Sequence, residues 1–313
     1  MTAALAAAEA SGLLPPGRPV VVMLSGGRDS VCLLDVAVTL AGAAAVRTLH
    51  VNYALREEAG EDERHCAELA SRLGVGLEVH RPGPPTGGNL HTWARDVRYA
   101  AATALAGDDR IAVGHTRTDQ AETVVYRLAA SPGRRALLGM APDDGRIVRP
   151  LLAVGRDDTA AHCVARGLAW REDALNDDPR FARARVREGV MPVLRGLHPA
   201  AEENIVRTAE LLREEGAVLD AAVDGVLGGA GDIGLADLAA LSPALARLVV
   251  RRLAEDATGG LCARAAARLS DLLALKEGAM DVGDGARAVV QEGRLRFVAS
   301  EGPASRRSGQ PGP

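Results

Sequence analysis

The residues best suited to chemistry begin with one short turn. It reads Ser25, Gly26, Gly27, Arg28, Asp29 and Ser30. It follows the apolar run Val20–Leu24 and precedes a helical pattern, so it predicts a turn between a buried strand and a helix. The glycines let a ligand approach the backbone, and the first N–H groups of a helix lack intrahelical partners. The turn is therefore predicted to bind phosphate. An ordinary glycine turn capped by Asp29 or Ser30 is the alternative.

Polar residues also follow two other strand-like runs. His50 and Asn52 come after one run, where they could contact a nucleotide or face solvent. After the other run, the sequence Gly114-His115 leads into a helical segment with Asp119 and Glu122. Because these two acids are three residues apart, their carboxylates share one helix face. They could bind a cation or an amine, whereas helix capping is the alternative.

Arginines form a third group of candidates. Arg95, Arg98 and Tyr99 have helical spacing, and Arg183, Arg185 and Arg187 form the densest basic segment. A guanidinium group binds phosphate through two hydrogen bonds, so this basic segment could bind phosphate groups. A solvated helix face explains the same spacing equally well.

Alternating strand and helix patterns must position these residues. The expected strands are Val20–Leu24, Val46–Val51, Gly76–His80 and Arg110–Gly114, and the expected helices are Asp29–Leu40, Glu61–Leu73, Leu90–Leu105 and Asp119–Ala130. This order predicts a doubly wound parallel α/β sheet with helices on both faces. Ligands of such sheets bind beyond the carboxyl ends of the strands, so the polar segments are expected in one site.

A second, smaller helical domain is expected after the sheet. The predicted domains are 1–199 for catalysis, 200–302 for binding the substrate, and a disordered tail at 303–313. The helical patterns are Glu202–Glu215, Leu235–Glu255 and Cys262–Leu275, followed by a hairpin of Ala286–Gln291 and Arg294–Ala299.

Composition narrows the class of protein. Apolar residues make up 47% of the chain, enough for a core, and the net charge of −4 does not by itself indicate a nucleic-acid binder. The four cysteines are scattered, which argues against a disulfide scaffold or zinc ribbon. We expect a cytoplasmic protein, because neither a signal peptide nor a membrane-spanning run is present.

In their order along the chain, these segments resemble the tRNA(Ile)-lysidine synthetase family. The first turn resembles the S-G-G-x-D-S loop of the PP-loop ATP pyrophosphatases, which cleave ATP to AMP and pyrophosphate. The other matching residues are His50, Asn52, Leu55 and Arg56; Ala94, Arg95, Arg98 and Tyr99; Gly114, His115 and Asp119 to Thr123; and Asp173, Asn176, Asp178, Phe181, Arg183, Arg185, Val186 and Arg187.

The resemblance implies an ATP-dependent carbon–nitrogen ligase. It would join L-lysine to C2 of the wobble cytidine in the CAU-anticodon isoleucine tRNA, through an adenylated cytidine. The product, lysidine, switches codon reading from AUG to AUA. The implied catalytic residues are Asp29, Arg95, Asp119 and Glu122. Asp29 would also bind Mg²⁺. The implied ATP-binding residues are Ser25, Gly26, Gly27, Arg28, Asp29, Ser30, His50, Asn52, Gly114, His115 and Arg185.

Several points stay open at this stage. The chain departs from the family pattern at Tyr53, Thr116, Thr118 and Ala184, and a long additional C-terminal tRNA-binding domain is not expected. The alternatives are another PP-loop tRNA-modifying or amide-forming synthetase, such as a tRNA thiolation enzyme, and a non-catalytic nucleotide-binding regulator. A homodimer is an open question, and no membrane partner is expected.

Overall fold

The computed structural model describes residues 1–55, 57–85, 87, 89–131, 133–171 and 182–300. The chain forms two compact units, Met1–Leu212 and Arg213–Pro313. Each unit has a core of its own.

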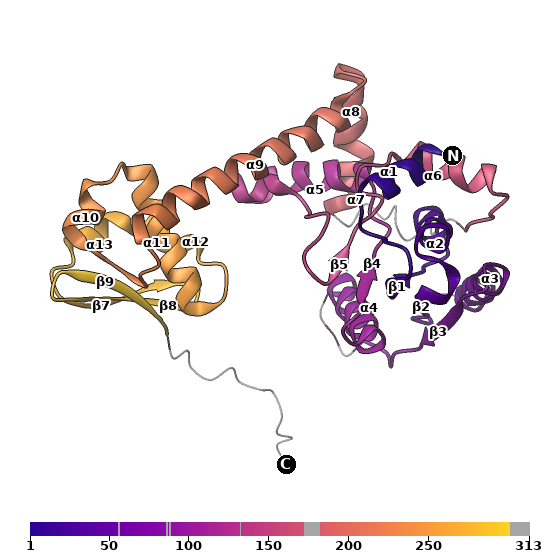
Figure 1. Cartoon of the computed structure of the whole chain (residues 1–313), viewed down its shortest axis with the longest axis horizontal. Helices are drawn as coiled ribbons and strands as arrows, with labels where there is room; N and C mark the ends of the chain where they lie inside the picture. Colours follow the sequence, from indigo (N-terminus) through magenta and orange to yellow (C-terminus); the bar gives the residue numbers. More distant parts are fainter. Residues whose placement is uncertain (56, 86, 88, 132, 172–181, 301–313) are drawn as a thin grey trace, which may run out of the picture. The chain divides into compact units, whose positions relative to one another are not determined.

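A parallel five-stranded sheet forms the centre of the first unit (Figure 1). Its strands are β1 (Val20–Met23), β2 (Val46–Val51), β3 (Gly76–His80), β4 (Arg110–Ala112) and β5 (Ile147–Val148), in the order β3-β2-β1-β4-β5. All four strand pairs are parallel. The order reverses between β1 and β4, which is where open α/β sheets bind ligands. The predicted doubly wound fold is confirmed.

Helices cover both faces of this sheet because successive strand residues point to opposite sides. Val20 and Val22 of β1 pack in the cluster that contains the core residues of α2 (Arg28–Ala41). Val21 and Met23 pack instead against Ala102 of α4 (Leu90–Ala106). The remaining helices of the unit are α1 (Ala3–Ala10), α3 (Ala59–Arg72), α5 (Arg117–Ala130), α6 (Arg156–Ala165), α7 (Ala182–Arg185) and α8 (Met191–Leu197), with 3₁₀ turns at Ala43–Ala45 and Arg134–Leu138 and a π-helical turn at Val186–Val190.

The first unit ends inside a long helix, α9 (Ala201–Leu227). Val206 of α9 packs with Ala121 of α5 and Met191 of α8, so the first turns of α9 belong to this unit. The domain boundary expected from the sequence, at residue 199, precedes this helix. In the structure, the first compact unit extends to Leu212.

The second unit combines helices with a four-stranded antiparallel sheet. The helices are α10 (Leu235–Ala240), α11 (Pro243–Thr258), α12 (Ala263–Ala267) and α13 (Leu269–Ala274), and the strands are β6 (Asp232–Gly234), β7 (Gly278–Gly283), β8 (Ala286–Gln291) and β9 (Arg294–Ala299), ordered β6-β9-β8-β7. The predicted hairpin is present as β8 and β9. The expectation of an otherwise helical domain missed β6 and β7, and the helix predicted for 235–255 is divided where Ser242 caps α11 and Pro243 begins it.

Two other expectations concern the cysteines and the membrane. All four cysteines are buried free thiols and pack as small apolar residues. Within the described ranges, no helix has both the length and the apolar character needed to cross a membrane. The tail predicted at 303–313 lies outside the described residues, as do Arg56, Asp173, Asn176, Asp178 and Phe181.

Candidate active site

The turn after β1 is built around its own hydroxyl groups. Gly26 has a φ of 86°, a conformation that favours glycine, and Gly27 is the N-cap of α2. The Ser30 hydroxyl donates to the carbonyl oxygen of Gly27 (2.8 Å), and its oxygen accepts from the backbone N–H of Ser25 (3.1 Å). The turn is thereby closed on itself, with the start of α2 directed at the space beyond β1.

Close backbone approaches explain two of the glycines. A Cβ atom on Gly114, after β4, would lie 3.0 Å from the carbonyl oxygen of Asp29. A Cβ atom on Gly26 would lie 3.3 Å from Cys66 Sγ. A Cβ atom on Gly27 would make only ordinary contacts, at 3.5 Å from Ser25 Oγ and 3.8 Å from the carbonyl oxygen of Arg171. The space next to Gly27 is therefore open to a ligand.

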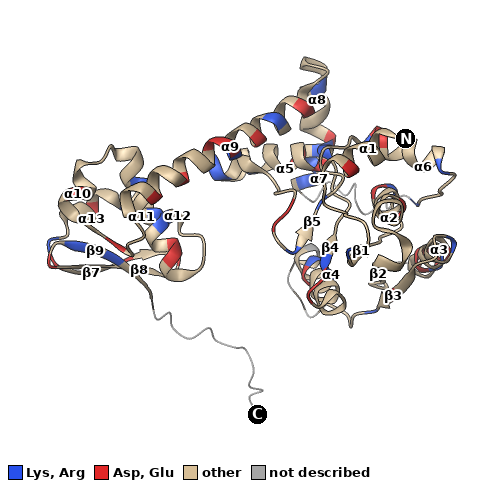
Figure 2. Cartoon of the chain, viewed as in Figure 1, with Lys and Arg blue, Asp and Glu red and all other residues tan. Residues whose placement is uncertain are grey.

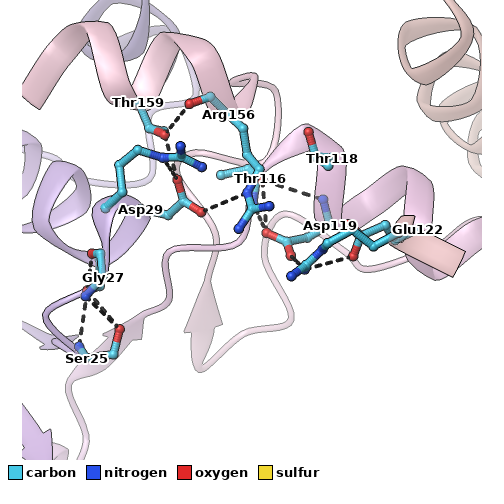
Figure 3. Close-up of polar contacts among 12 residues, drawn as sticks. Ser25, Gly27, Asp29, Thr116, Thr118, Asp119, Glu122, Arg156 and Thr159 are labelled. Carbon is cyan, nitrogen blue, oxygen red and sulfur yellow. Dashed lines mark hydrogen bonds and ion pairs between the residues drawn. The ribbon is translucent and has the colours of Figure 1, made fainter. Parts of the chain in front are cut away.

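Two side chains of helix α6 hold Asp29, which lies in the first turn of α2 (Figure 3). The Thr159 hydroxyl donates to Asp29 Oδ1 (2.6 Å), and Arg156 Nε lies 3.7 Å from Asp29 Oδ2. The adjacent Arg28 Nε also lies 3.3 Å from Asp29 Oδ1. These contacts fix the Asp29 carboxylate beside the turn.

A cavity of about 480 Å³ lies beyond the carboxyl ends of β1, β2 and β4. It brings together most of the residues predicted from the sequence. The predicted residues that line it are Ser25, Gly27, Arg28, Asp29, Ser30, His50, Asn52, Gly114, His115 and Asp119. Segments that are far apart in the chain thus share one site, as the strand-end argument predicted.

The side chains of His50 and Asn52 make different hydrogen bonds in this cavity. His50 is buried and its Nδ1–H donates to the carbonyl oxygen of Leu24 (2.9 Å), which leaves Nε2 as its acceptor. Asn52 uses its whole amide locally, since it donates to Glu63 Oε2 (2.9 Å) and accepts from the N–H of Ala54 (2.9 Å). Asn52 therefore shapes the segment after β2, and His50 has a nitrogen left for a ligand.

Helix α5 begins with a capping box that engages Asp119 (Figure 3). The backbone N–H and the hydroxyl of Thr116 donate to Asp119 Oδ2 (2.8 and 2.9 Å), and Arg183 Nη2 lies 3.5 Å from Asp119 Oδ1. Burial alone would raise the pKa of Asp119. The Arg183 and His115 charges and the Thr116 hydrogen bonds outweigh burial, and they hold that pKa below its usual range. Asp119 is consequently an anion at neutral pH that lines the cavity.

Glu122 lies on the same helix in a different environment. Its side chain is completely buried, and it accepts two hydrogen bonds from Arg187, at 2.8 Å from Nε and 3.1 Å from Nη2. Arg183 Nε lies 3.6 Å from Glu122 Oε2. Figure 2 shows basic parts of the chain, in blue, beside α7 and near α5. Arg187 lines the cavity, whereas Glu122 is not among the described residues that line it.

His115 is a neutral base within reach of this cluster. Desolvation by burial lowers its pKa to about 4, against the opposing charge of Asp119. Its Nδ1 atom is buried and has no hydrogen-bond partner within the described residues. The residue itself is among those that line the cavity.

Four predicted residues, Gly26, Glu122, Arg95 and Arg185, are not among the described residues that line the cavity. Arg95 is exposed and stacks on its own helix neighbour, with its guanidinium carbon 4.6 Å from the centre of the Tyr99 ring. Arg185 is exposed on α7. Of the described arginines in these two motifs, Arg98 and Arg187 line the cavity instead.

The cavity also contains residues that the sequence reasoning missed. Arg156, Trp170 and Arg171 line it, although no motif marked them. Arg171 donates from Nε to Asp62 Oδ1 (2.6 Å), and its own N–H donates to the carbonyl oxygen of Gly26 (3.0 Å). Only the packing of α6 and the segment after it against α2 brings these residues to the site.

The departures from the family pattern have local structural roles. Thr116 supplies the N-cap of α5, and the buried Thr118 hydroxyl donates to Glu202 Oε2 (2.9 Å). Ala184 is buried on α7. Tyr53 lines the cavity and donates its hydroxyl to the carbonyl oxygen of Ala94 (2.8 Å).

The geometry defines the class of protein, and comparison with known proteins agrees. Residues 5–194 match the PP-loop domain family, and this range contains the turn at residues 25–30 and the described residues that line the cavity. In fold, U34-tRNA thiolase NcsA from Methanococcus maripaludis is similar, with a TM-score of 0.56 at 16% identity over 67% of this chain and 78% of that chain.

More similar sequences identify the particular family. The tRNA(Ile)-lysidine synthase of Salinispora tropica is 37% identical over 313 residues, which cover 91% of this chain and 92% of that protein. That of Deinococcus radiodurans is 42% identical over 212 residues, or 66% of this chain. The chain belongs to the tRNA(Ile)-lysidine synthase family. It spans 36% of the length of the Deinococcus protein and 58% of the Solibacter usitatus protein of the same name.

Proposed function

We propose that this protein uses ATP to join L-lysine to C2 of the wobble cytidine in the CAU-anticodon isoleucine tRNA. The observation that carries the proposal is the cavity that holds both the phosphate turn and the anionic Asp119. The first can bind the polyphosphate of ATP, and the second can bind an amine. Relatives named tRNA(Ile)-lysidine synthase supply the identity of the acceptor. ATP and tRNA as substrates place the proposed activity in the cytoplasm.

The first step would form the adenylated cytidine. The cytidine C2 oxygen attacks the ATP α-phosphate, and the bond to pyrophosphate breaks. The N–H groups at the start of α2 and the guanidinium groups of Arg156 and Arg171 line the cavity where negative charge grows on the leaving group. The open space beside Gly27 supports a phosphate at this point.

One carboxylate of this site, that of Asp29, is suited to bind a magnesium ion. Mg²⁺ is commonly bound by one or two carboxylates together with substrate phosphates, so Asp29 beside the phosphate turn would suffice as the protein ligand. The ion would add positive charge next to the phosphates. Among the described residues, no group of three or more His, Cys, Asp or Glu side chains could hold a metal by itself.

The second step would transfer lysine. The ε-amine attacks C2, AMP leaves, and the amine gives up a proton. Lysine arrives protonated, since its reference pKa is about 10.4. Asp119 can hold this cation but is too acidic to be an efficient base. His115, whose pKa is about 4, is likewise a weak base at neutral pH, so the released proton would pass to solvent. Glu122 would act indirectly, by holding Arg187.

Labelled lysine provides the direct test. The protein is incubated with ATP, labelled lysine and a CAU-anticodon isoleucine tRNA transcript. We expect incorporation that needs ATP and disappears when uridine replaces the wobble cytidine. Absence of incorporation with a folded protein, or incorporation that ignores the wobble base, refutes the proposal.

A variant of the turn tests the phosphate site by itself. Gly27→Val should abolish ATP binding, because its side chain would fill the open space beside the turn without a clash against the protein at Cβ. An ATP affinity equal to that of the unaltered protein would show that the phosphates bind elsewhere.

A further inference from the structure

One aromatic pair lies at the cavity in a chain that is only 2% aromatic. Tyr53 lines the cavity, and Trp93 of α4 packs against it with ring centroids 5.6 Å apart and a 59° angle between planes. Neither the phosphate turn nor the amine site uses these rings. Their position at a nucleotide-sized cavity calls for a role of their own.

The Tyr53 ring is held in one orientation. Its hydroxyl donates to the carbonyl oxygen of Ala94 (2.8 Å), and its ring packs against the neighbouring residue Trp93. Helix α4 therefore contacts both the hydroxyl group and the ring of Tyr53. Tyr53 is half-buried, and burial raises its pKa, which keeps the hydroxyl protonated as a donor. A ring that is already fixed loses little conformational entropy when a ligand stacks on it.

Tyr53 lies at a part of the cavity where neighbouring residues are exposed. It lies two residues beyond the end of β2, and the next residues, Ala54 and Leu55, are exposed. Arg98, one turn along α4 from Ala94, is exposed and lines the cavity on this side. The cavity is also lined by the apolar residues Met23, Leu49 and Val51 at the ends of β1 and β2. Apolar side chains that could contact the adenine of ATP are thus available without Tyr53.

We propose that Tyr53, held by Trp93 and Ala94, is a stacking platform for an unpaired base of the acceptor RNA, and that Arg98 binds a phosphate beside that base. This inference rests on the proposed function, which makes RNA the acceptor. Unpaired bases in RNA loops are recognised by stacking on aromatic rings, and arginine binds the adjoining backbone. Because Ala54, Leu55 and Arg98 beside Tyr53 are exposed, a macromolecular substrate could reach this part of the cavity while ATP occupies the strand ends.

A fluorescent RNA tests the platform without requiring lysine transfer. The probe is an anticodon stem-loop with a CAU anticodon that carries pyrrolocytidine, whose emission falls on stacking, at the wobble position. With the unaltered protein we expect saturable quenching. Tyr53→Phe keeps the ring and should keep the quenching. Tyr53→Leu should lose it and raise the Kd for RNA about tenfold, which is about 1.4 kcal/mol and within the range for base–aromatic stacking. Tyr126→Leu, a change at an exposed tyrosine of α5, is the matched control and should leave both unchanged.

The possible outcomes separate the two proposals. Quenching without lysine incorporation refutes the proposed function but keeps the platform. Lysine incorporation by the unaltered protein, combined with unchanged RNA affinity and quenching in Tyr53→Leu, overturns the platform alone. A loss of ATP affinity in Tyr53→Leu, measured without RNA, with RNA quenching intact would assign the ring to adenine and also overturn it.

Arg98→Gln guards against a Tyr53→Leu variant that fails to fold. Arg98 is exposed, so its replacement should not unfold the protein. If it binds one phosphate, the slope of log Kd for RNA against log salt should fall by about one in the variant. An unchanged slope would remove Arg98 from the proposal.

Discussion

Replacing the Asp119 carboxylate with an amide should separate the two chemical steps. Asp119→Asn keeps a carbonyl oxygen that can accept from the N–H of Thr116, so the cap of α5 survives in part. The variant loses the negative charge that faces the cavity. Two unit charges about 4 Å apart interact by about 4 kcal/mol at an effective dielectric constant of about 20, and the amide dipole recovers part of this. A net loss of about 2–4 kcal/mol corresponds to a fall of about 30- to 700-fold in kcat/KM for lysine.

The assay measures three quantities on the same variant. ATP affinity and tRNA-dependent pyrophosphate release without lysine should stay close to normal, because neither needs the amine site. Lysine incorporation should fall by the stated factor. Glu9→Gln, which removes one exposed carboxylate from α1, is the control for a general charge effect. Normal kcat/KM for lysine in Asp119→Asn would refute the amine-site assignment. An equal loss of pyrophosphate release would show that Asp119 acts in the first step instead.

Three further predictions concern the folding stability that residues in and around the site provide. Gly114→Ala should lower the free energy of unfolding by about 1–3 kcal/mol, because its Cβ would lie 3.0 Å from the carbonyl oxygen of Asp29. Gly60→Ala, in an open helical position, should be neutral or stabilising by up to about 1 kcal/mol in the same denaturant titration. Because the folded pKa of His115 lies at about 4 and its ordinary value is 6.5, the unfolded state binds more protons between these values. Stability should therefore fall as pH drops from 6.5 to about 4, and replacement of His115 by Asn should flatten this dependence in urea titrations. Arg187→Ala removes both hydrogen bonds to the buried Glu122, leaves Arg183 at 3.6 Å as the nearby cation and should cost up to about 3–5 kcal/mol of stability. Adding Glu122→Gln should recover part of this loss; no recovery would mean that the pair is not coupled.

Local sequence patterns predicted the strands of this protein well. The observed bounds of β2, β3, β8 and β9 equal the predicted ones, because each is a short run with few competing signals. Strand β7 gave no such signal, since Gly278–Gly283 contains two glycines and is largely exposed. The break before α11 did have a signal, because Ser242-Pro243 is a typical helix start.

The partners of Asp29 could not be predicted in the same way. Thr159 is 130 residues away in the chain, and only the packing of α6 on α2 brings its hydroxyl to the carboxylate. The same holds for Arg156 and Arg171, which belong to no recognisable motif. Strand ends determine where a site lies in such a sheet, but the residues that later elements contribute to it depend on tertiary packing.

The two acids of α5 illustrate why spacing alone does not assign a role. Asp119 and Glu122 are three residues apart on one helix face, a spacing that predicts a shared task. In the structure, Glu122 is buried in a bidentate pair with Arg187, whereas Asp119 lines the cavity. Glu122 already accepts two hydrogen bonds from Arg187 and lies 3.6 Å from Arg183, so it is poorly suited to hold a further cation. Its charge instead positions Arg187 at the cavity wall. One acid thus faces the proposed amine, and the other positions an arginine that can meet a phosphate.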